Sequence, residues 1–189
     1  DVRIEDGGRV TAEEVFLGGI PLELQEGQDF SWDLVANGNG TITVTGEGST
    51  LEVTSLHTLF VGYSGTGVLD VNEGGQIVSE GVVVGGTPGS TGTVFVHDEG
   101  SQLTADEELL LGAWGHGSLM VSAGGAVEVS QLMVGGFEPN DTGLDPQVQA
   151  AFGDPQGTGT IVVTGEGSSL TVLESAYIGY SGDAFVDVN

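Results

Sequence analysis

The sequence has 189 residues, of which 35 are Gly and none is Cys, and its formal net charge at pH 7 is −26. Without Cys the chain can form neither disulfides nor Cys-ligated zinc sites. Its only basic residues, Arg3 and Arg9, cannot supply the cationic surface that nucleic acids and anionic membranes require. Because 38% of the residues are hydrophobic, and because no long apolar run is present, we expect an ordered chain that neither binds nucleic acid nor inserts into a membrane.

A pattern of about 25 residues repeats along the chain in two alternating forms. The Gly-Gly repeats (repeats 1, 3 and 5) carry Gly-Gly in their first turn, at residues 7–8, 74–75 and 124–125. The Gly-Ser repeats (repeats 2, 4 and 6) carry Glu-Gly-Ser there, at residues 47–49, 99–101 and 166–168. Residues 185–189 return to the phase of residue 1 and begin a seventh repeat.

Each repeat contains three short runs in which apolar residues fall at alternate positions, which is the period of a β-strand. The first runs contain Val2/Ile4, Ile42/Val44, Leu69/Val71, Val94/Val96, Leu119/Val121, Ile161/Val163 and Val186/Val188. The second runs contain Val10/Ala12, Leu51/Val53, Ile77/Ser79, Leu103/Ala105, Val127/Val129 and Leu170/Val172. The third runs contain Val15/Leu17, Leu59/Val61, Val82/Val84, Leu109/Leu111, Leu132/Val134 and Ala176/Ile178.

One repeat cannot fold alone, since about six small aliphatic side chains do not offset the backbone entropy of its residues. Stacking the repeats at strand spacing joins these side chains into one core. The pattern therefore predicts an all-β, parallel β-solenoid with three strands per rung, six to seven rungs and a triangular cross-section. Residues 1–189 would form a single domain. The competing all-β fold is a hairpin-built sandwich, which does not need three equivalent apolar pairs in every repeat.

Two segments, residues 20–39 and 137–158, interrupt the pattern directly after the Gly-Gly that closes repeats 1 and 5. In a stack of repeats, both insertions leave from the same corner. Loops on one face of a solenoid commonly form its binding face. Phe30, Trp32 and Phe152 are therefore candidate ligand-binding residues; the alternative is that they only cover the flank of the core.

The combined pattern resembles the repeat of type V secretion (autotransporter) passengers and of PEP-CTERM-associated exported proteins. The resemblance rests on the Gly-Thr-rich first strand, x-Gly-Ser-x-Leu, Val-Gly-x-Ser-Gly and Leu-x-Val-x-x-Gly-Gly-x-Val, and it covers almost the whole chain outside the insertions. It implies a right-handed parallel β-helix, export, and a place at the cell surface or in the extracellular matrix.

Acidic residues recur at two positions of the repeat. The residue before the Gly of the first turn is Asp6, Glu47, Glu73, Glu99 or Glu166, and only repeat 5 has Ala123 there. A second stripe, before the third strand, consists of Glu13, Glu80, Glu107 and Glu174, with His57 and Ser130 between them. Oxygen ligands at flexible turns suit calcium, so the first stripe is a candidate calcium site. The alternative is a solvated acidic face that keeps the protein soluble.

No catalytic constellation stands out in the sequence, so we expect a protein that is not an enzyme. His57, His97 and His116 occupy three different positions of the repeat. Our first hypothesis is an exported structural or adhesive segment of a cell-surface or matrix protein, which requires no cofactor. The second is a glycan-binding or glycan-processing β-helix whose site lies between the insertions.

Neither end of the chain carries a capping helix or a polar terminal repeat. Solenoids with uncapped ends expose strand edges that recruit other strands. The chain is therefore expected either to be a window of a longer solenoid or to self-associate end to end into filaments.

Overall fold

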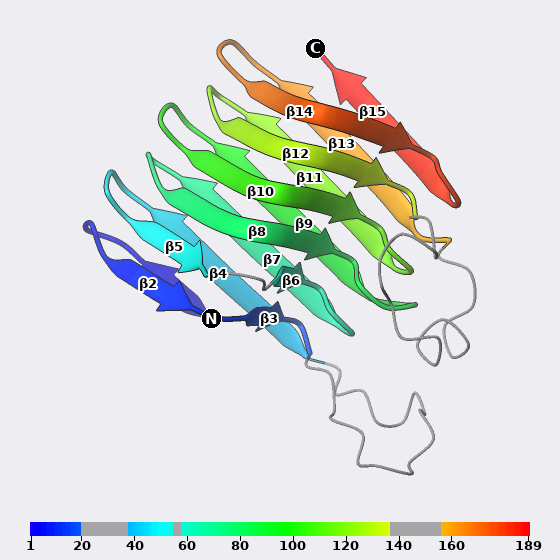
Figure 1. Ribbon diagram of the computed structural model, residues 1–189. Helices are drawn as coiled ribbons and strands as arrows, with labels where there is room; N and C mark the ends of the chain where they lie inside the picture. Colours follow the sequence, from blue (N-terminus) through cyan, green and yellow to red (C-terminus); the bar gives the residue numbers. More distant parts are fainter. Residues whose placement is uncertain (20–37, 55–57, 137–155) are drawn as a thin grey trace.

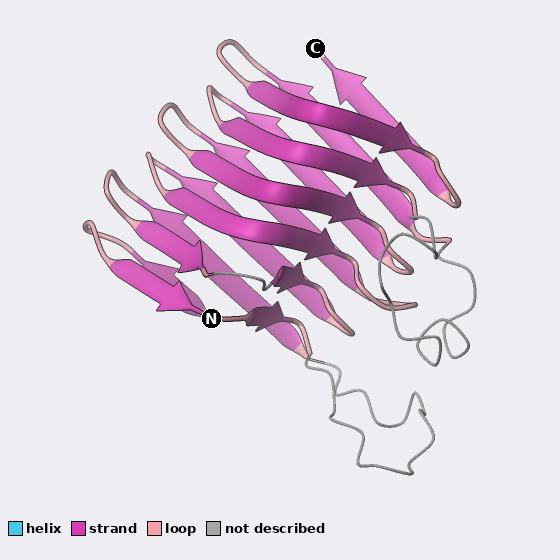
Figure 2. Cartoon of the chain, viewed as in Figure 1, coloured by secondary structure: helices cyan, strands magenta, loops and turns pink. Residues whose placement is uncertain are grey.

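The computed structural model describes residues 1–19, 38–54, 58–136 and 156–189, and in these ranges it contains β-strands and no helix. The strands form two sheets in which neighbouring strands are parallel (Figures 1 and 2). The prediction of an all-β chain with parallel strands is confirmed for the described residues.

Sheet A collects the first strand of every repeat, in the order in which the repeats follow one another. Its strands are β1 (Val2–Ile4), β4 (Asn39–Thr45), β7 (Thr66–Asn72), β9 (Thr91–His97), β11 (His116–Ser122), β13 (Thr158–Thr164) and β15 (Asp183–Val188). Two of these strands begin inside the ends of the predicted insertions, since Asn39 and Thr158 already belong to sheet A.

Sheet B contains the remaining described strands, and these also lie side by side in the order of the repeats. Its strands are β2 (Arg9–Ala12), β3 (Val15–Leu17), β5 (Thr50–Val53), β6 (Thr58–Val61), β8 (Gln76–Val84), β10 (Gln102–Leu111), β12 (Ala126–Val134) and β14 (Ser169–Ile178). The chain thus passes alternately through the two sheets. Each repeat adds one strand to sheet A, and it adds two short strands (repeats 1 and 2) or one long strand (repeats 3 to 6) to sheet B.

The structure differs from the prediction of three strands per rung. From repeat 3 onward the second and third predicted strands are one strand, as in β8 and β10. A register shift between Ala105 and Glu108 marks the predicted break, and both sides of it stay paired with β8 and β12. Repeats 1 and 2 keep separate second and third strands, but these too belong to sheet B, so the described strands form two sheets and not three.

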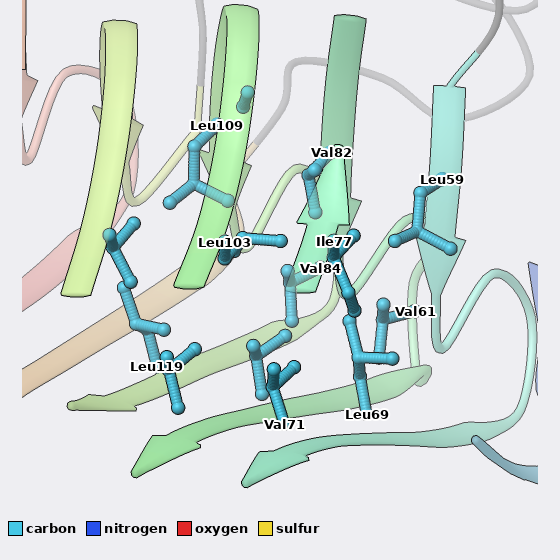
Figure 3. Close-up of a cluster of buried hydrophobic side chains, with 14 of the residues drawn as sticks. Leu59, Val61, Leu69, Val71, Ile77, Val82, Val84, Leu103, Leu109 and Leu119 are labelled. Atoms are coloured by element: carbon cyan, nitrogen blue, oxygen red, sulfur yellow. The ribbon is translucent and has the colours of Figure 1, made fainter. Parts of the chain in front are cut away.

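The core lies between the two sheets and consists of the alternating aliphatic residues. In strands β7 and β9, buried residues alternate strictly with half-buried or exposed ones, as the sequence period predicts. Figure 3 shows side chains such as Leu69, Ile77 and Leu109 pointing from both sheets into one continuous cluster. The inward positions predicted for repeats 2 to 5 are confirmed.

Candidate functional site

The turn between the first two strands differs between the two forms of repeat. In Gly-Gly repeats, Asp6, Glu73 and Ala123 adopt positive φ angles of 56°, 52° and 51°, and each is followed by a Gly with positive φ. The turn closes with a hydrogen bond from the second Gly, such as that from the Gly75 N–H to the Asn72 carbonyl at 3.0 Å. Two successive residues with positive φ make this a tight turn, and it joins a strand of sheet A to a strand of sheet B.

Gly-Ser repeats have one more residue in this turn, and Gly46, Asp98 and Gly165 take the first positive φ there. The added length places the Ser hydroxyl under the turn of the preceding repeat. The Gly7, Gly74 and Gly124 N–H groups donate to Ser49, Ser101 and Ser168 Oγ at 3.1, 3.0 and 3.1 Å. These bonds join repeats 1 and 2, 3 and 4, and 5 and 6, which explains why the two forms alternate.

The first acidic stripe lies in these turns, and all five of its acidic residues are exposed. Successive turns are in contact, since a Cβ on Gly74 would lie 3.4 Å from the Cα of Glu47. Thr45 Oγ1 lies 3.2 Å from Glu73 Oε2. The stripe members Asp6, Glu47 and Glu73, with Arg3 and Glu5, line a hollow of about 240 Å³.

Within the described ranges, no three His, Asp or Glu side chains are grouped so that they could hold one metal ion. The structure therefore stacks Asp6, Glu47, Glu73, Glu99 and Glu166 along one edge without gathering them into a coordination shell. Calcium binding by this stripe stays a prediction.

A second acidic surface lies where sheet B shifts register. Glu107 and Glu174 of the second stripe, together with Asp106, Glu108 and Gln131, line an open hollow of about 280 Å³. Ser130, which interrupts the stripe, donates a hydrogen bond of 2.6 Å to the Asp106 carbonyl. Glu108 is half-buried, and burial followed by repulsion from Glu107 raises the pKa of its carboxyl. The second stripe, as defined from the sequence, did not include Asp106 and Glu108. These two additional acidic residues interrupt the alternation of apolar residues there and could have indicated the site.

The structure places the histidines apart, as far as they are described. His97 Nε2 lies 2.9 Å from Asp70 Oδ1, and His97 Nδ1 lies 3.1 Å from Asp98 Oδ2. His116 is exposed at the start of β11, and His57 lies outside the described residues.

An apolar row on the outer face of sheet B was missed by the sequence analysis. The middle residue of each third run faces away from the core, and the register aligns these residues across six repeats as Phe16, Phe60, Val83, Leu110, Met133 and Tyr177. The rings of Phe16 and Phe60 stack at 4.9 Å, and Tyr63 packs edge-on against both. The third run is apolar at all three positions in every repeat. This continuous apolar run could have indicated that the outward residue is apolar too.

This outer row, which we call the apolar row, is partly shielded from solvent. Val83 and Leu110 are only 9% and 5% exposed, and they form a second cluster with Ala113, Trp114 and neighbouring row members. Tyr177, the last member of the row, is exposed and packs edge to face with the exposed Tyr180, which follows β14. The row is therefore buried at Val83 and Leu110 and exposed to solvent at Tyr177.

The predicted ligand-binding residues Phe30, Trp32 and Phe152 lie outside the described residues, as do 20–37 and 137–155 of the two insertions. Their role as a binding face stays a prediction. The described part of the chain has no helix that is long and apolar enough to span a membrane.

Comparison with known proteins finds two relatives at low identity. The chain is 35% identical over 135 residues to the Adhesin BmaC autotransporter of Brucella suis biovar 1 (strain 1330), a match covering 69% of this chain and 3% of that protein. It is 28% identical over 129 residues to the Uncharacterized lipoprotein YdeK of Escherichia coli (strain K12), covering 68% of this chain and 9% of that protein. The chain thus spans less than a tenth of either relative.

No protein-family model and no solved structure matches the chain. The homology supports the autotransporter-like resemblance at a coarse level. Neither relative is named as a PEP-CTERM protein, so that part of the resemblance stays a prediction.

Proposed function

We propose that the chain is an adhesive segment of an exported protein at the cell surface or envelope. The observation that carries this proposal is the match over most of the chain to a stretch of an autotransporter adhesin. The second relative is named as a lipoprotein, which supports an envelope location. The chain's own repeats supply a stiff scaffold on which side chains recur at strand spacing, and this suits repeated contacts with a surface.

The finer architecture belongs to the same proposal. The two parallel sheets are successive faces of a right-handed β-solenoid of about 25 residues per turn, and the insertions leave from one corner of it. Two facts support this: the chain visits the sheets alternately, and both sheets grow in sequence order, sheet A by one strand per repeat and sheet B by two strands in repeats 1 and 2 and by one long strand in each later repeat. Right-handed connections between parallel strands of one sheet are the general rule.

We also propose that the chain is not an enzyme and needs no cofactor. The described carboxylates of the two stripes lie at turns or at the register shift of sheet B, whereas Glu52, Asp70 and Glu128 lie within strands. The two arginines are both in repeat 1, where Arg3 pairs with Glu5 and Arg9 with Glu52.

The adhesive function is tested with beads that carry the protein at a fixed density. We expect several-fold more beads to stay on washed epithelial cell layers than beads carrying an unrelated folded protein of similar negative charge. A second control is Leu69→Asp, which places a carboxylate in the core and unfolds the chain while changing the charge by one. Equal retention of all three bead types would contradict adhesion.

A second candidate function is glycan binding, which the exposed pair Tyr177 and Tyr180 favours because aromatic rings stack on sugars. A glycan array tests it directly. Signals that disappear in a Tyr177→Ala and Tyr180→Ala double variant would support it, and a reducing-sugar assay would reveal glycan processing. A blank array together with cell binding would leave adhesion to proteins.

A further inference from the structure

The outer face of sheet A carries a strip of apolar side chains on three adjacent strands. Phe95, Met120 and Val162 each lie between two core residues of their own strand, so they face away from the core. The register places Met120 beside Phe95 on one side and beside Val162 on the other. Their strands β9, β11 and β13 lie inside sheet A, between β7 and β15 (Figure 1). The strip therefore runs across the strands, in the direction in which the repeats stack.

Polar side chains flank the strip along both of its sides, because residues two apart in a strand point to the same face of the sheet. Five of these six flanking residues carry a hydroxyl group and one is a histidine. Before the strip they are Thr93, Ser118 and Thr160, aligned in register, and after it they are His97, Ser122 and Thr164. All six are half-buried, as are Phe95 and Val162, whereas Met120 is 39% exposed. Each apolar member of the strip thus has a polar side chain on either side.

The strip and its flanking residues, which we call the panel, contain no carboxylate. Strands β9, β11 and β13 have no Asp, Glu, Lys or Arg, although the chain has 28 acidic residues. In contrast, each long strand of sheet B contains at least one Glu. Asp70 lies beside Phe95 on the neighbouring strand β7, and its Oδ1 is 2.9 Å from His97 Nε2. The panel is therefore a carboxylate-free surface on a chain whose net charge is −26.

We propose that the panel binds a neutral, unbranched polysaccharide that lies along the strip. A sugar ring has apolar C–H faces and a rim of hydroxyl groups. The C–H faces pack on Phe95, Met120 and Val162, and the ring hydroxyls exchange hydrogen bonds with the hydroxyl side chains on both sides. The strand spacing of about 4.8 Å offers equivalent side chains to successive rings. This face is not the one that carries Tyr177 and Tyr180, and its binding does not require the adhesive function proposed above.

Charge and size favour a neutral polysaccharide over other partners. Polysaccharides that carry uronic acids or sulfates are repelled by a net charge of −26. A cationic partner finds no carboxylate in the panel and is attracted instead to the acidic turns and to the register shift of sheet B. Three apolar side chains are also few for a protein partner, since a standard interface takes about 20 residues from each side.

Binding is tested by biolayer interferometry of the full chain over sensors that carry biotinylated glucomannan, hydroxyethyl cellulose or amylose. We expect the chain to bind at least one of these neutral polymers and to bind polygalacturonate, an anionic polymer, more weakly. The absence of binding to all three neutral polymers would overturn the proposal. Equal or stronger binding to polygalacturonate would also overturn it.

Matched variants locate the site. Met120→Thr and Val78→Thr shorten apolar side chains of similar exposure, 39% and 37%, on the outer faces of sheets A and B. Phe95→Thr removes the aromatic ring of the strip. We expect Met120→Thr and Phe95→Thr each to raise Kd about two- to tenfold and Val78→Thr to leave Kd unchanged. Circular dichroism checks that each variant keeps its β-structure.

A second pair tests the hydroxyl contacts. Thr93→Val and Thr104→Val each remove one hydroxyl from a half-buried position, on β9 and β10. Only Thr93→Val is expected to raise Kd, by about twofold or more. Equal effects of the two substitutions would contradict hydrogen bonding by the panel.

Two further results would overturn the proposal. One is a pair of strip variants that bind as tightly as Val78→Thr. The other is binding that survives in Phe95→Thr but disappears in the Tyr177→Ala and Tyr180→Ala double variant, which would assign the polysaccharide to the tyrosine pair. Because no cells are used, failure of this experiment is distinguishable from failure of the bead assay for adhesion.

Discussion

The hydroxyl of Ser101 accepts a hydrogen bond of 3.0 Å from the N–H of Gly74, which belongs to the preceding repeat. Both residues lie at the same turn of successive repeats, and Ser101 is 1% exposed. The bond satisfies a turn N–H that has no partner within its own repeat in the described hydrogen bonds. The contact makes a pair of repeats, and not the single repeat, the unit that recurs along the chain.

Replacing this serine is expected to destabilise the protein. Ser101→Ala leaves the Gly74 N–H without its acceptor, which costs about 1–3 kcal/mol of unfolding free energy. Ser118→Ala, at a half-buried position on β11, is the matched control and is expected to change stability by less than about 0.5 kcal/mol. Urea unfolding followed by circular dichroism measures both. A similar loss in the two variants would contradict the role of the Ser101 bond.

The glycine that ends the third run is required by a close approach of two backbones. Gly62 has φ of 72°, and a Cβ there would lie 2.2 Å from the Thr91 carbonyl oxygen. Gly62→Ala is expected to cost more than about 3 kcal/mol, since it adds a backbone clash to the strain of positive φ. Gly89→Ala separates the two effects, because Gly89 has φ of 80° and open space around its Cβ.

Only the strain of positive φ, about 1–2 kcal/mol, is expected for Gly89→Ala. Thermal unfolding of the two alanine variants gives the comparison. Equal losses of stability in Gly62→Ala and Gly89→Ala would mean that the close approach of Gly62 to Thr91 adds nothing to the cost of the substitution.

Glu108 is expected to make stability depend on pH. Burial raises the pKa of its carboxyl in the folded state, so folding favours the protonated form. This group therefore destabilises the fold as pH rises from the unfolded pKa through the folded one, and its effect vanishes below the unfolded pKa. Glu108→Gln is expected to raise Tm at pH 7 and to leave Tm unchanged at about pH 3.5.

The control for this variant is Glu128→Gln, which removes an equal charge from an exposed position on β12. Both variants remove one negative charge, so the difference between their Tm values measures the effect of burying Glu108. A Glu108→Gln variant that is no more stable than Glu128→Gln at pH 7 would contradict the expected effect.

The first acidic stripe is expected to respond to divalent cations as a line of charge and not as a chelating site. Carboxylates on adjacent turns lie about 4.8 Å apart along the strand spacing, so calcium between them relieves repulsion. Millimolar calcium should raise Tm more than NaCl at equal ionic strength, and Glu47→Gln with Glu73→Gln should reduce this difference. Identical responses to both salts would leave only general screening.

Local periodicity was sufficient to predict the parts of this fold that depend on side-chain alternation. Leu69, Ile77 and Leu109 were assigned inward from their spacing, and all three are fully buried. Alternation is a property of neighbouring residues within one strand, so it is visible without the tertiary structure. The recurrence of Gly at turns was visible for the same reason, because positive φ is a local demand.

The joining of strands could not be predicted from the same pattern. Asp106 and Glu107 interrupt the apolar period and indicate a turn, yet β10 continues through them. The hydrogen bonds of β8 and β12 on either side hold this segment extended, and those partners lie one repeat away in sequence.

The sequence by itself determined the repeat length, the strand period and the residues of the core, since each follows from the spacing of apolar residues and glycines. Only the tertiary structure decided which surfaces those repeats build. Phe16 and Phe60 stack, Ser101 reaches Gly74, and Glu108 becomes half-buried because stacking places residues of neighbouring repeats within a few ångströms. Such contacts depend on register between strands, and register is set by the packing of the whole stack.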